Sequence, residues 1–303
     1  MSMEMSRMVG RCITRPLKNR VLLCLLLALF PLAYFSAVQT WSYPYSCTLI
    51  PRLFGGQMSN LIAEGDTLVI NMAKGLFFER ISHDERAQFR SLMRVFDDKV
   101  APKITYFLYA GALLGSYSHH GMIPWDDDMD IIVRYTDRGV LLNALKSLAP
   151  EFGYNTEDES SWKLYYANST NAGTKPWSWP FLDIFFYYEY PTYIQDARES
   201  YKKFIRSDVF PLTTRPFMGM MLPAPRKTRE FLRVTYDIDL CTSNSYDHKR
   251  EKYIPCYHIS KIPCHHLRDR FRFVRRVYEG NKTIEILEDH YHITVNKSVH
   301  VHG

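Results

Sequence analysis

The chain has 303 residues, of which 46% are hydrophobic, 15% aromatic and 23% charged, and its formal net charge is a mild +6. This composition is typical of a globular protein with a real core, and it excludes a disordered chain. The sequence contains no internal repeat and no low-complexity tract, which excludes a repeat protein.

The N-terminus predicts a membrane anchor. Residues 21–38 carry no charge and are just long enough to span a bilayer. Five basic residues precede them, so the positive-inside rule predicts a cytosolic tail, 1–20, and a luminal remainder. A cleaved signal peptide is the alternative, but the small residues that a peptidase needs near Ala37 are poorly placed. We predict a single-pass type II protein of the Golgi or ER membrane.

The luminal part is expected to comprise a stem, 39–80, a catalytic domain, 81–290, and a tail, 291–303. About 220 of the 303 residues follow the anchor and stem, enough for one sizeable domain. A short strand is predicted at 67–71. Ser82 and Glu85 are spaced as a capping box, and apolar residues at helical spacing predict a helix that Pro102 ends.

A glycine-containing segment follows a short apolar run, 104–109, that predicts a buried strand. Glycines permit a tight turn and a close approach of backbone to ligand. The N–H groups at the start of a short helix favour phosphate oxygens. We therefore predict a donor-phosphate site here, formed by Gly111, Gly115, Ser116, His119 and His120.

The acidic run 126–130 leads into a β-branched apolar segment. Alternate strand residues share a face, so Asp128 and Asp130 are expected to point the same way. Their carboxylates repel each other unless a cation lies between them, and oxygen ligands suit Mg²⁺ or Mn²⁺. An EF-hand is excluded, because Ile131 stands where that loop needs glycine. The alternative is an acidic turn that only caps a strand.

Further elements follow in order. Thr136 is the expected N-cap of a helix that runs to about Leu148, and aromatic-rich strands are predicted at 161–167 and 181–188. In the loop between these strands, Trp177 and Trp179 either stack on a sugar or base or pack in the ordinary way. Pro225 is expected to open a helix at about 226–237.

Asp183 can face the acidic run from the neighbouring strand. There it is expected to be the third metal ligand or the acceptor of a hydroxyl proton, unless it merely caps a loop. Asp126 and Asp127 are expected to lie behind the metal ligands or in a turn, because too many direct carboxylates would leave no room for phosphate.

Three sequons support a luminal location, namely those of Asn168, Asn281 and Asn296. An oxidising lumen also allows disulfides among four cysteines in any of three pairings; these are Cys47, Cys241, Cys256 and Cys264. Alternatively, Cys256 and Cys264 bind zinc with nearby histidines, although their spacing matches no standard zinc pattern.

Positive charge concentrates at 249–252 and 268–276. The arginines and aromatics of 268–276 are typical of nucleic-acid contacts, but a luminal protein rarely meets nucleic acid. We expect no nucleic-acid partner and interpret this run as a solvated helix face, with contact to an anionic donor or glycan as the alternative. The His-rich segment 290–303 is expected to be peripheral and frayed.

Two motifs together, Ala110–Gly115 and Ile123–Asp130, closely resemble the signature of the LicD/fukutin family. Residues 181–185 resemble its second acidic strand, and 210–236 its downstream block. The resemblance covers about residues 104–240 and implies an α/β (α+β) fold, with a nucleotidyltransferase-like mixed sheet flanked by helices. Ser118 stands where many relatives have a basic residue, and His119 and His120 are the candidates to replace it.

The resemblance also implies a function: metal-dependent transfer of a phospho-alditol or phosphocholine group from a CDP-linked donor to a glycan. The residues agree with that chemistry, because phosphoryl transfer needs positioning and charge neutralisation more than covalent work. Two alternatives stay open. One is a glycosyltransferase whose D-x-D motif binds a nucleotide sugar through Mn²⁺. The other is a catalytically silent luminal binding protein of the same fold.

Overall fold

The computed structural model describes residues 67–255, 258–280, 282–288 and 299–302. The cytosolic tail, the membrane anchor and most of the stem were predicted for residues 1–66, which lie outside this described part. Within the described part, none of the helices has the length and apolar character needed to cross a bilayer.

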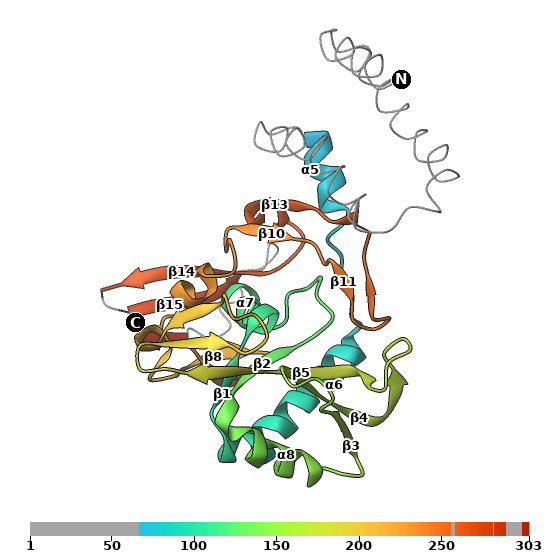
Figure 1. Ribbon diagram of the computed structural model, residues 1–303. Helices are drawn as coiled ribbons and strands as arrows, with labels where there is room; N and C mark the ends of the chain where they lie inside the picture. The colour runs from blue at the N-terminus through green and yellow to red at the C-terminus, as the bar shows by residue number, and fades with distance from the viewer. Residues whose placement is uncertain (1–66, 256–257, 281, 289–298, 303) are drawn as a thin grey trace, which may run out of the picture. The chain divides into compact units, whose positions relative to one another are not determined.

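Helices and strands alternate along the described chain to form a mixed α/β fold (Figure 1). The helices are α5 (Thr67–Lys74), α6 (His83–Val95), α7 (Ala110–His119), α8 (Arg138–Lys146), α9 (Arg206–Val209) and α10 (Thr228–Arg233). The strands up to residue 205 are β1 (Tyr106–Leu108), β2 (Asp130–Arg134), β3 (Phe152–Asn155), β4 (Ser161–Asn171), β5 (Ser178–Glu189), β6 (Tyr193–Asp196) and β7 (Lys203–Ile205). The later strands are β8 (Thr213–Phe217), β9 (Met220–Ala224), β10 (Leu240–Thr242), β11 (Tyr246–Asp247), β12 (Lys252–Tyr253), β13 (Lys261–Pro263), β14 (Phe273–Glu279), β15 (Lys282–Glu288) and β16 (Val299–His302).

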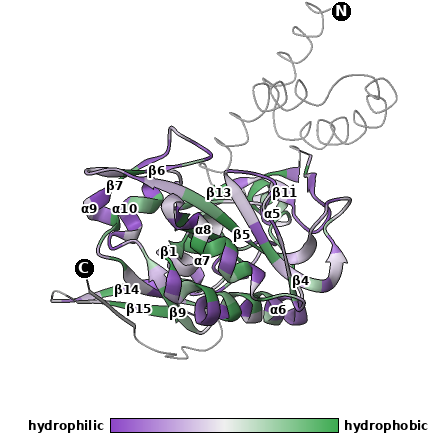
Figure 2. Ribbon diagram, turned by 60° about the horizontal axis from the view of Figure 1, so that its bottom comes forward, coloured by the Kyte–Doolittle hydropathy of each residue, from purple (hydrophilic) through white to green (hydrophobic). Residues whose placement is uncertain are grey.

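A seven-stranded sheet organises the core. Its main path is β1-β2-β5-β4-β3, and β6 and β7 extend it from β5. The β2–β5 pair is parallel and the other pairs are antiparallel, so the sheet is mixed, as the sequence predicted. The middle of β5 is hydrophobic in Figure 2, in keeping with its burial along most of its length.

One face of this sheet is covered by α8 and by the turns that follow α6. The ring of Phe96 packs edge-on against Tyr106 of β1, and the guanidinium of Arg138 lies over the ring of Phe186 of β5. Figure 1 shows α8 below the sheet and α7 above it.

The opposite face carries the acidic residues. Phe107 of β1 is the register partner of Ile132 of β2 and contacts Phe231 of α10. Since alternate residues share a face, Asp130 lies on the same side as Ile132, and so does Asp183, its register partner on β5. The α7 and α10 helices contact each other on this side.

The predicted capping box is confirmed. The hydroxyl of Ser82 accepts from the backbone N–H of Glu85 at 3.2 Å, and the carboxylate of Glu85 accepts from the N–H of Ser82 at 2.8 Å. After α6 the chain continues as a π turn, Phe96–Val100, and a 3-10 turn, Ala101–Lys103, before β1 begins. The helical segment therefore extends to the predicted proline, but its last two turns are not α-helical.

Other boundaries need correction. The strand predicted at 67–71 is wrong, because these residues lie in α5, where Val69, Ile70 and Ala73 share an apolar helix face. Thr136 is not the N-cap of α8; that position is Asp137, whose carboxylate instead accepts from Thr105 N–H at 2.9 Å. The helix predicted at 226–237 is confined to α10.

The C-terminal predictions are also corrected. The basic run 268–276 is not a helix face, because it passes through a turn into β14, whose Phe273 and Val274 are buried. Residues 299–302 of the predicted frayed tail form β16, which pairs with β15. Strand pairing thus determines the secondary structure of both segments, since neither has a helical repeat of apolar residues.

Candidate active site

The N-terminus of α7 lies directly against two carboxylates. The backbone N–H of Gly111 donates to Asp130 Oδ2 at 3.0 Å. A Cβ atom on residue 111 would lie 2.8 Å from Asp126 Oδ2 and 3.3 Å from Asp130 Oδ2, so a side chain here would have to displace these carboxylates. The partial positive charge at a helix N-terminus stabilises anionic groups placed there. The close approach predicted for Gly111 is therefore made to these carboxylates.

Three carboxylates converge next to this helix end. Asp130 and Asp183 are register partners on β2 and β5, and Asp183 N–H donates to the carbonyl of Met129 at 2.8 Å. Asp128 precedes β2. One carboxylate oxygen from each of Asp128, Asp130 and Asp183 can be chosen so that all three lie within 4.8 Å of one another. The structure thus brings together the three residues that the sequence predicted as metal ligands.

A lysine that was not identified from the sequence lies next to these carboxylates, on the neighbouring strand β4. Lys163 of β4 is the register partner of Asp183, and the two side chains form a short, largely buried ion pair. The Lys163 ammonium also lies 3.9 Å from the ring centroid of Phe181 and 5.1 Å from that of Trp177. A lysine within a predicted aromatic strand is a signal that could have marked this residue.

A second group of polar side chains surrounds Asp127, which is buried. Its carboxylate accepts from Asn244 Nδ2 at 2.9 Å, from His248 N–H at 3.1 Å and from His248 Nδ1 at 2.8 Å. The other ring nitrogen of His248 lies 3.2 Å from Asp128 Oδ2. Asp127 thus supports the run from behind, and His248 links it to Asp128; neither Asn244 nor His248 was identified from the sequence.

The site carries strongly perturbed acid groups. Burial raises the pKa of Asp130 well above its usual value, and the neighbouring carboxylates of Asp128, Asp183 and Asp126 raise it further. Burial likewise raises the pKa of Asp126. It also raises the pKa of Asp183, although the charge of Lys163 opposes the shift.

The pKa of the His248 imidazole is raised, although burial by itself would lower it. Burial alone would lower the pKa of His248, but the carboxylates of Asp128, Asp127 and Asp126 raise it to about 10. His248 is therefore an imidazolium at neutral pH, which lets both of its ring nitrogens donate to carboxylates.

The donor set fits a hard divalent cation. Two cationic side chains, Lys163 and His248, face five carboxylates, namely Asp126, Asp127, Asp128, Asp130 and Asp183. A divalent ion between the oxygens of Asp128, Asp130 and Asp183 would relieve the repulsion that contributes to the raised pKa values of Asp130 and Asp183, and Mg²⁺ or Mn²⁺ prefers such oxygen ligands.

Two of the predicted phosphate-binding residues make structural contacts. A Cβ atom on Gly115 would lie 2.3 Å from the carbonyl oxygen of Gly121, so the loop after α7 packs against residue 115. Ser116 is fully buried and its hydroxyl donates to the carbonyl of Pro216 at 2.8 Å. The structure brings neither residue to the carboxylates.

The two histidines at the end of α7 are also engaged. His119 Nδ1 donates to the carbonyl of Arg272 at 2.6 Å, and His120 Nε2 lies 3.0 Å from Glu285 Oε2. At 1.5 Å per residue, His119 is about 12 Å along the helix from Gly111. Of the five residues predicted to bind phosphate, Gly111 is the one that the structure places at the carboxylates.

The tryptophans of the 171–180 segment have different surroundings. Trp179 is buried and its indole N–H donates to the carbonyl of Asp127 at 2.9 Å, which is ordinary packing. Trp177 is half-buried beside Lys163.

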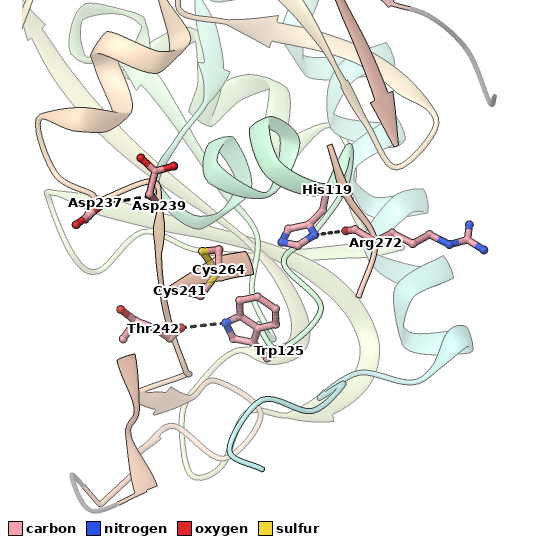
Figure 3. The surroundings of a disulfide bond; sticks show 8 residues. All are labelled: His119, Trp125, Asp237, Asp239, Cys241, Thr242, Cys264 and Arg272. Carbon is pink, nitrogen blue, oxygen red and sulfur yellow. Dashed lines mark hydrogen bonds between the residues drawn. A yellow bond between two sulfur atoms is a disulfide. The ribbon is translucent and has the colours of Figure 1, made fainter. Parts of the chain in front are cut away.

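One disulfide is present in the described residues. Cys241 and Cys264 are bonded and join β10 to the turn that follows β13, and Figure 3 shows the pair next to Trp125. The zinc alternative for Cys264 is therefore wrong, because its sulfur is not a thiolate. Cys47 and Cys256 lie outside the described residues, as do the sequon asparagines Asn281 and Asn296, whereas Asn168 is exposed on β4.

We call the three carboxylates of Asp128, Asp130 and Asp183 the acidic row. Comparison with known families identifies the region that contains it. The family model described as LicD/FKTN/FKRP, nucleotidyltransferase domain, matches residues 103–227. The match includes Asp128, Asp130, Lys163 and Asp183 and ends before Asn244. A comparison with curated proteins finds no significant match.

Proposed function

Because this chain belongs to the LicD/FKTN/FKRP family, we propose that it transfers a phosphate-linked group from a CDP-linked donor to a glycan in a metal-dependent reaction. The observation that carries the proposal is the convergence of the carboxylates of Asp128, Asp130 and Asp183 at the N-terminus of α7, within the matched region. The mixed sheet that holds them supports a nucleotidyltransferase-like fold.

Each residue has a role in this proposal. Asp128 and Asp130 would hold Mg²⁺ or Mn²⁺, and Asp183 would complete the ligand set or accept a proton. A bound ion would neutralise charge on the donor diphosphate. Lys163 pairs with Asp183 and fixes its orientation. Asp126 and Asp127 lie behind the ligands, and Asp127 is held by Asn244 and His248.

The proposed reaction balances as a substitution at phosphorus. The glycan hydroxyl oxygen attacks the phosphorus next to the alditol or choline, and the bond from that phosphorus to the bridging oxygen breaks, so that CMP leaves. The hydroxyl proton passes to a base. Asp183 suits this role because burial raises its pKa toward the working pH.

We further propose that the domain works in the lumen of the Golgi or ER, anchored by residues 21–38. Treatment with an N-glycosidase should increase the gel mobility of protein made in a secretory-pathway host, and the protein should resist carbonate extraction. Release of a soluble, shortened chain would contradict the anchor and favour a cleaved signal.

The test of the activity is a screen of CDP-linked donors against a purified chain with Mn²⁺ and glycan acceptors, read by mass spectrometry. We expect a glycan whose mass increases by the group plus its phosphate. Asp130→Asn should abolish this product, whereas Asp84→Asn, the same change at an exposed carboxylate, should not. A product lacking phosphorus would favour the glycosyltransferase, and no product with any CDP- or sugar-nucleotide donor would favour the silent binding protein.

A further inference from the structure

A cavity lies away from the acidic row. Its volume is about 630 Å³, and it is bordered by α6, the loop after α7 and the segment that leads into β14. This volume is within the range of about 300–1,000 Å³ that is usual for small-molecule sites. We call it the basic cavity.

Positive charge dominates its lining. Five arginines border it, namely Arg86, Arg90, Arg268, Arg270 and Arg272. The two carboxylates at the cavity are those of Glu79 and Asp269, and Asp269 already pairs with Lys74 at 2.5 Å. The cavity therefore has an excess of positive charge that favours an anion.

Among the cavity arginines, we infer that Arg86 and Arg90 are the most available to bind an anionic ligand. They lie four residues apart on α6 and so share a helix face, where like charges repel. Neither guanidinium pairs with a carboxylate among the residues that the structure describes. By contrast, Arg268 lies 3.8 Å from Glu288, and Arg270 donates to the carbonyl of Lys74 at 2.5 Å.

The remaining wall is apolar and well anchored. Met122, Met218 and Phe271 border the cavity, and such groups pack against the C–H faces of a sugar ring. The backbone of Arg272 is held by the bond from His119, and Figure 3 shows its guanidinium pointing away from the disulfide. The lining thus joins guanidiniums for an anion to an apolar surface for a ring.

We propose that the basic cavity binds an acidic sugar, meaning a sugar that carries a phosphate or sulfate ester. Guanidiniums match the geometry of such oxyanions through paired N–H donors. The site is separate from the acidic row. Gly111, at one end of α7, contacts Asp130, whereas His119, at the other end, borders the cavity. The inference needs only the charge and shape of the cavity and does not depend on the proposed transfer.

Calorimetric titration of the full chain with a hexose 6-phosphate, a hexose 6-sulfate and the neutral hexose, in chelator and low salt, tests this site. We expect at least one ester to bind and the neutral sugar not to bind. The ester that binds more tightly identifies the source of the anion. Equal binding of the neutral sugar, or no binding of either ester, would overturn the proposal.

Variants locate the binding. Arg86→Gln/Arg90→Gln should weaken the Kd of the bound ester at least tenfold. Arg94→Gln, the same change one turn further along α6 at an exposed arginine outside the cavity, should leave it within twofold. An unchanged Kd in the double variant would overturn the proposal. Melting temperature checks folding, and the single change Arg86→Gln, with an intermediate effect, serves if the double variant unfolds.

Asp130→Asn separates this site from the proposed active site. We expect this variant to bind the ester with unchanged Kd, whether or not it retains transferase activity. Loss of ester binding in Asp130→Asn would place the ligand at the acidic row and overturn the proposal. Failure of the transferase assay alone leaves these binding outcomes intact, so the two proposals fail separately.

Discussion

Asp130 and Asp183 occupy the same register position of the parallel strands β2 and β5, so their carboxylates lie side by side on one face of the sheet. Lys163 occupies the next position across the sheet, on β4. Two acids and a lysine in one cross-strand row form an unusual core, because the acids repel each other while burial removes the water that would screen them.

Neutralising Asp130 should stabilise the metal-free protein. Its pKa is raised by burial and neighbouring carboxylates, so keeping it ionised at pH 7 costs folding free energy. In chelator, Asp130→Asn should raise Tm by a few degrees, which corresponds to about 1 kcal/mol. The rise in Tm that Mn²⁺ causes in the unaltered protein should be lost. Asp84→Asn is the control, and an equal Mn²⁺ effect in Asp130→Asn would exclude Asp130 as a ligand.

Removing Lys163 should move the pH dependence of turnover. Lys163 opposes the upward shift of the Asp183 pKa, so Lys163→Met should raise that pKa further. An ionised Asp183 is then reached only at higher pH, and the acidic limb of the pH–kcat profile should move up by roughly 1–3 units, the usual effect of an adjacent opposite charge. Lys163→Arg should restore most of the limb. An unmoved limb in Lys163→Met would show that Lys163 does not control Asp183.

His248→Ala should weaken metal binding without unfolding the domain. His248 contacts Asp127 through its backbone and ring and reaches Asp128 with its other nitrogen. The change leaves the buried Asp127 carboxylate short of a donor, which costs about 1–3 kcal/mol. Metal-dependent turnover should therefore fall, while His265→Ala, at an exposed histidine, should behave as the unaltered protein. Normal activity at every Mn²⁺ concentration in His248→Ala would contradict this role.

His119 should make folding stability fall in mild acid. Burial lowers its pKa to about 4 in the folded protein, against an ordinary value near 6.5 when unfolded. Between these values the unfolded chain binds the extra proton, so this contribution is complete above pH 6.5 and is lost as pH falls toward 4. The loss amounts to at most about 3 kcal/mol.

The measurement is chemical denaturation of the unaltered protein, of His119→Gln and of the control His83→Gln from pH 7 to pH 4. The difference between the first two isolates His119 from other titrating groups. We expect the free energy of unfolding of His119→Gln to fall less steeply with acid, and that of His83→Gln to follow the unaltered protein, because His83 is exposed. Parallel curves for all three would contradict a buried neutral His119.

The disulfide should hold the segment that carries Asn244 and His248. Cys241 and Cys264 are separated by 23 positions, and closing such a loop stabilises a fold by about 3 kcal/mol. Cys241→Ser/Cys264→Ser should therefore lower the free energy of unfolding and weaken the Mn²⁺ effect on Tm. Reducing agent should affect the unaltered protein in the same way; stability that resists both treatments would contradict this role.

The acidic row was predictable from the sequence because it depends on patterns between residues that are close together in the chain. Alternation along a strand puts Asp183 on one face of the sheet, and Gly111 indicates a close approach of the backbone to another group. Lys163 was missed because its position depends on the register between β4 and β5, which alternation alone does not specify. His248 was missed because it meets Asp127 from 121 residues away, outside the matched family region.

The histidines of α7 show the converse. His119 and His120 follow the glycines closely in sequence, which suggested a shared phosphate site, but helix rise separates them from Gly111. His119 instead anchors Arg272, and His120 contacts Glu285, which also pairs with Arg215 at 2.7 Å. The strand predicted at 67–71 failed for another reason: its β-branched residues favour a strand locally, but the packing of Val69 and Ile70 against the rest of the fold selects the helix.

The nucleotide that is released shows whether a group is transferred together with its phosphate. A CDP-linked alditol labelled in the phosphate next to the alditol is incubated with the purified chain, Mn²⁺ and a glycan acceptor. We expect transfer of the phosphate: release of CMP and label in the glycan, both abolished by Asp130→Asn. Release of CDP with an unlabelled glycan would contradict it.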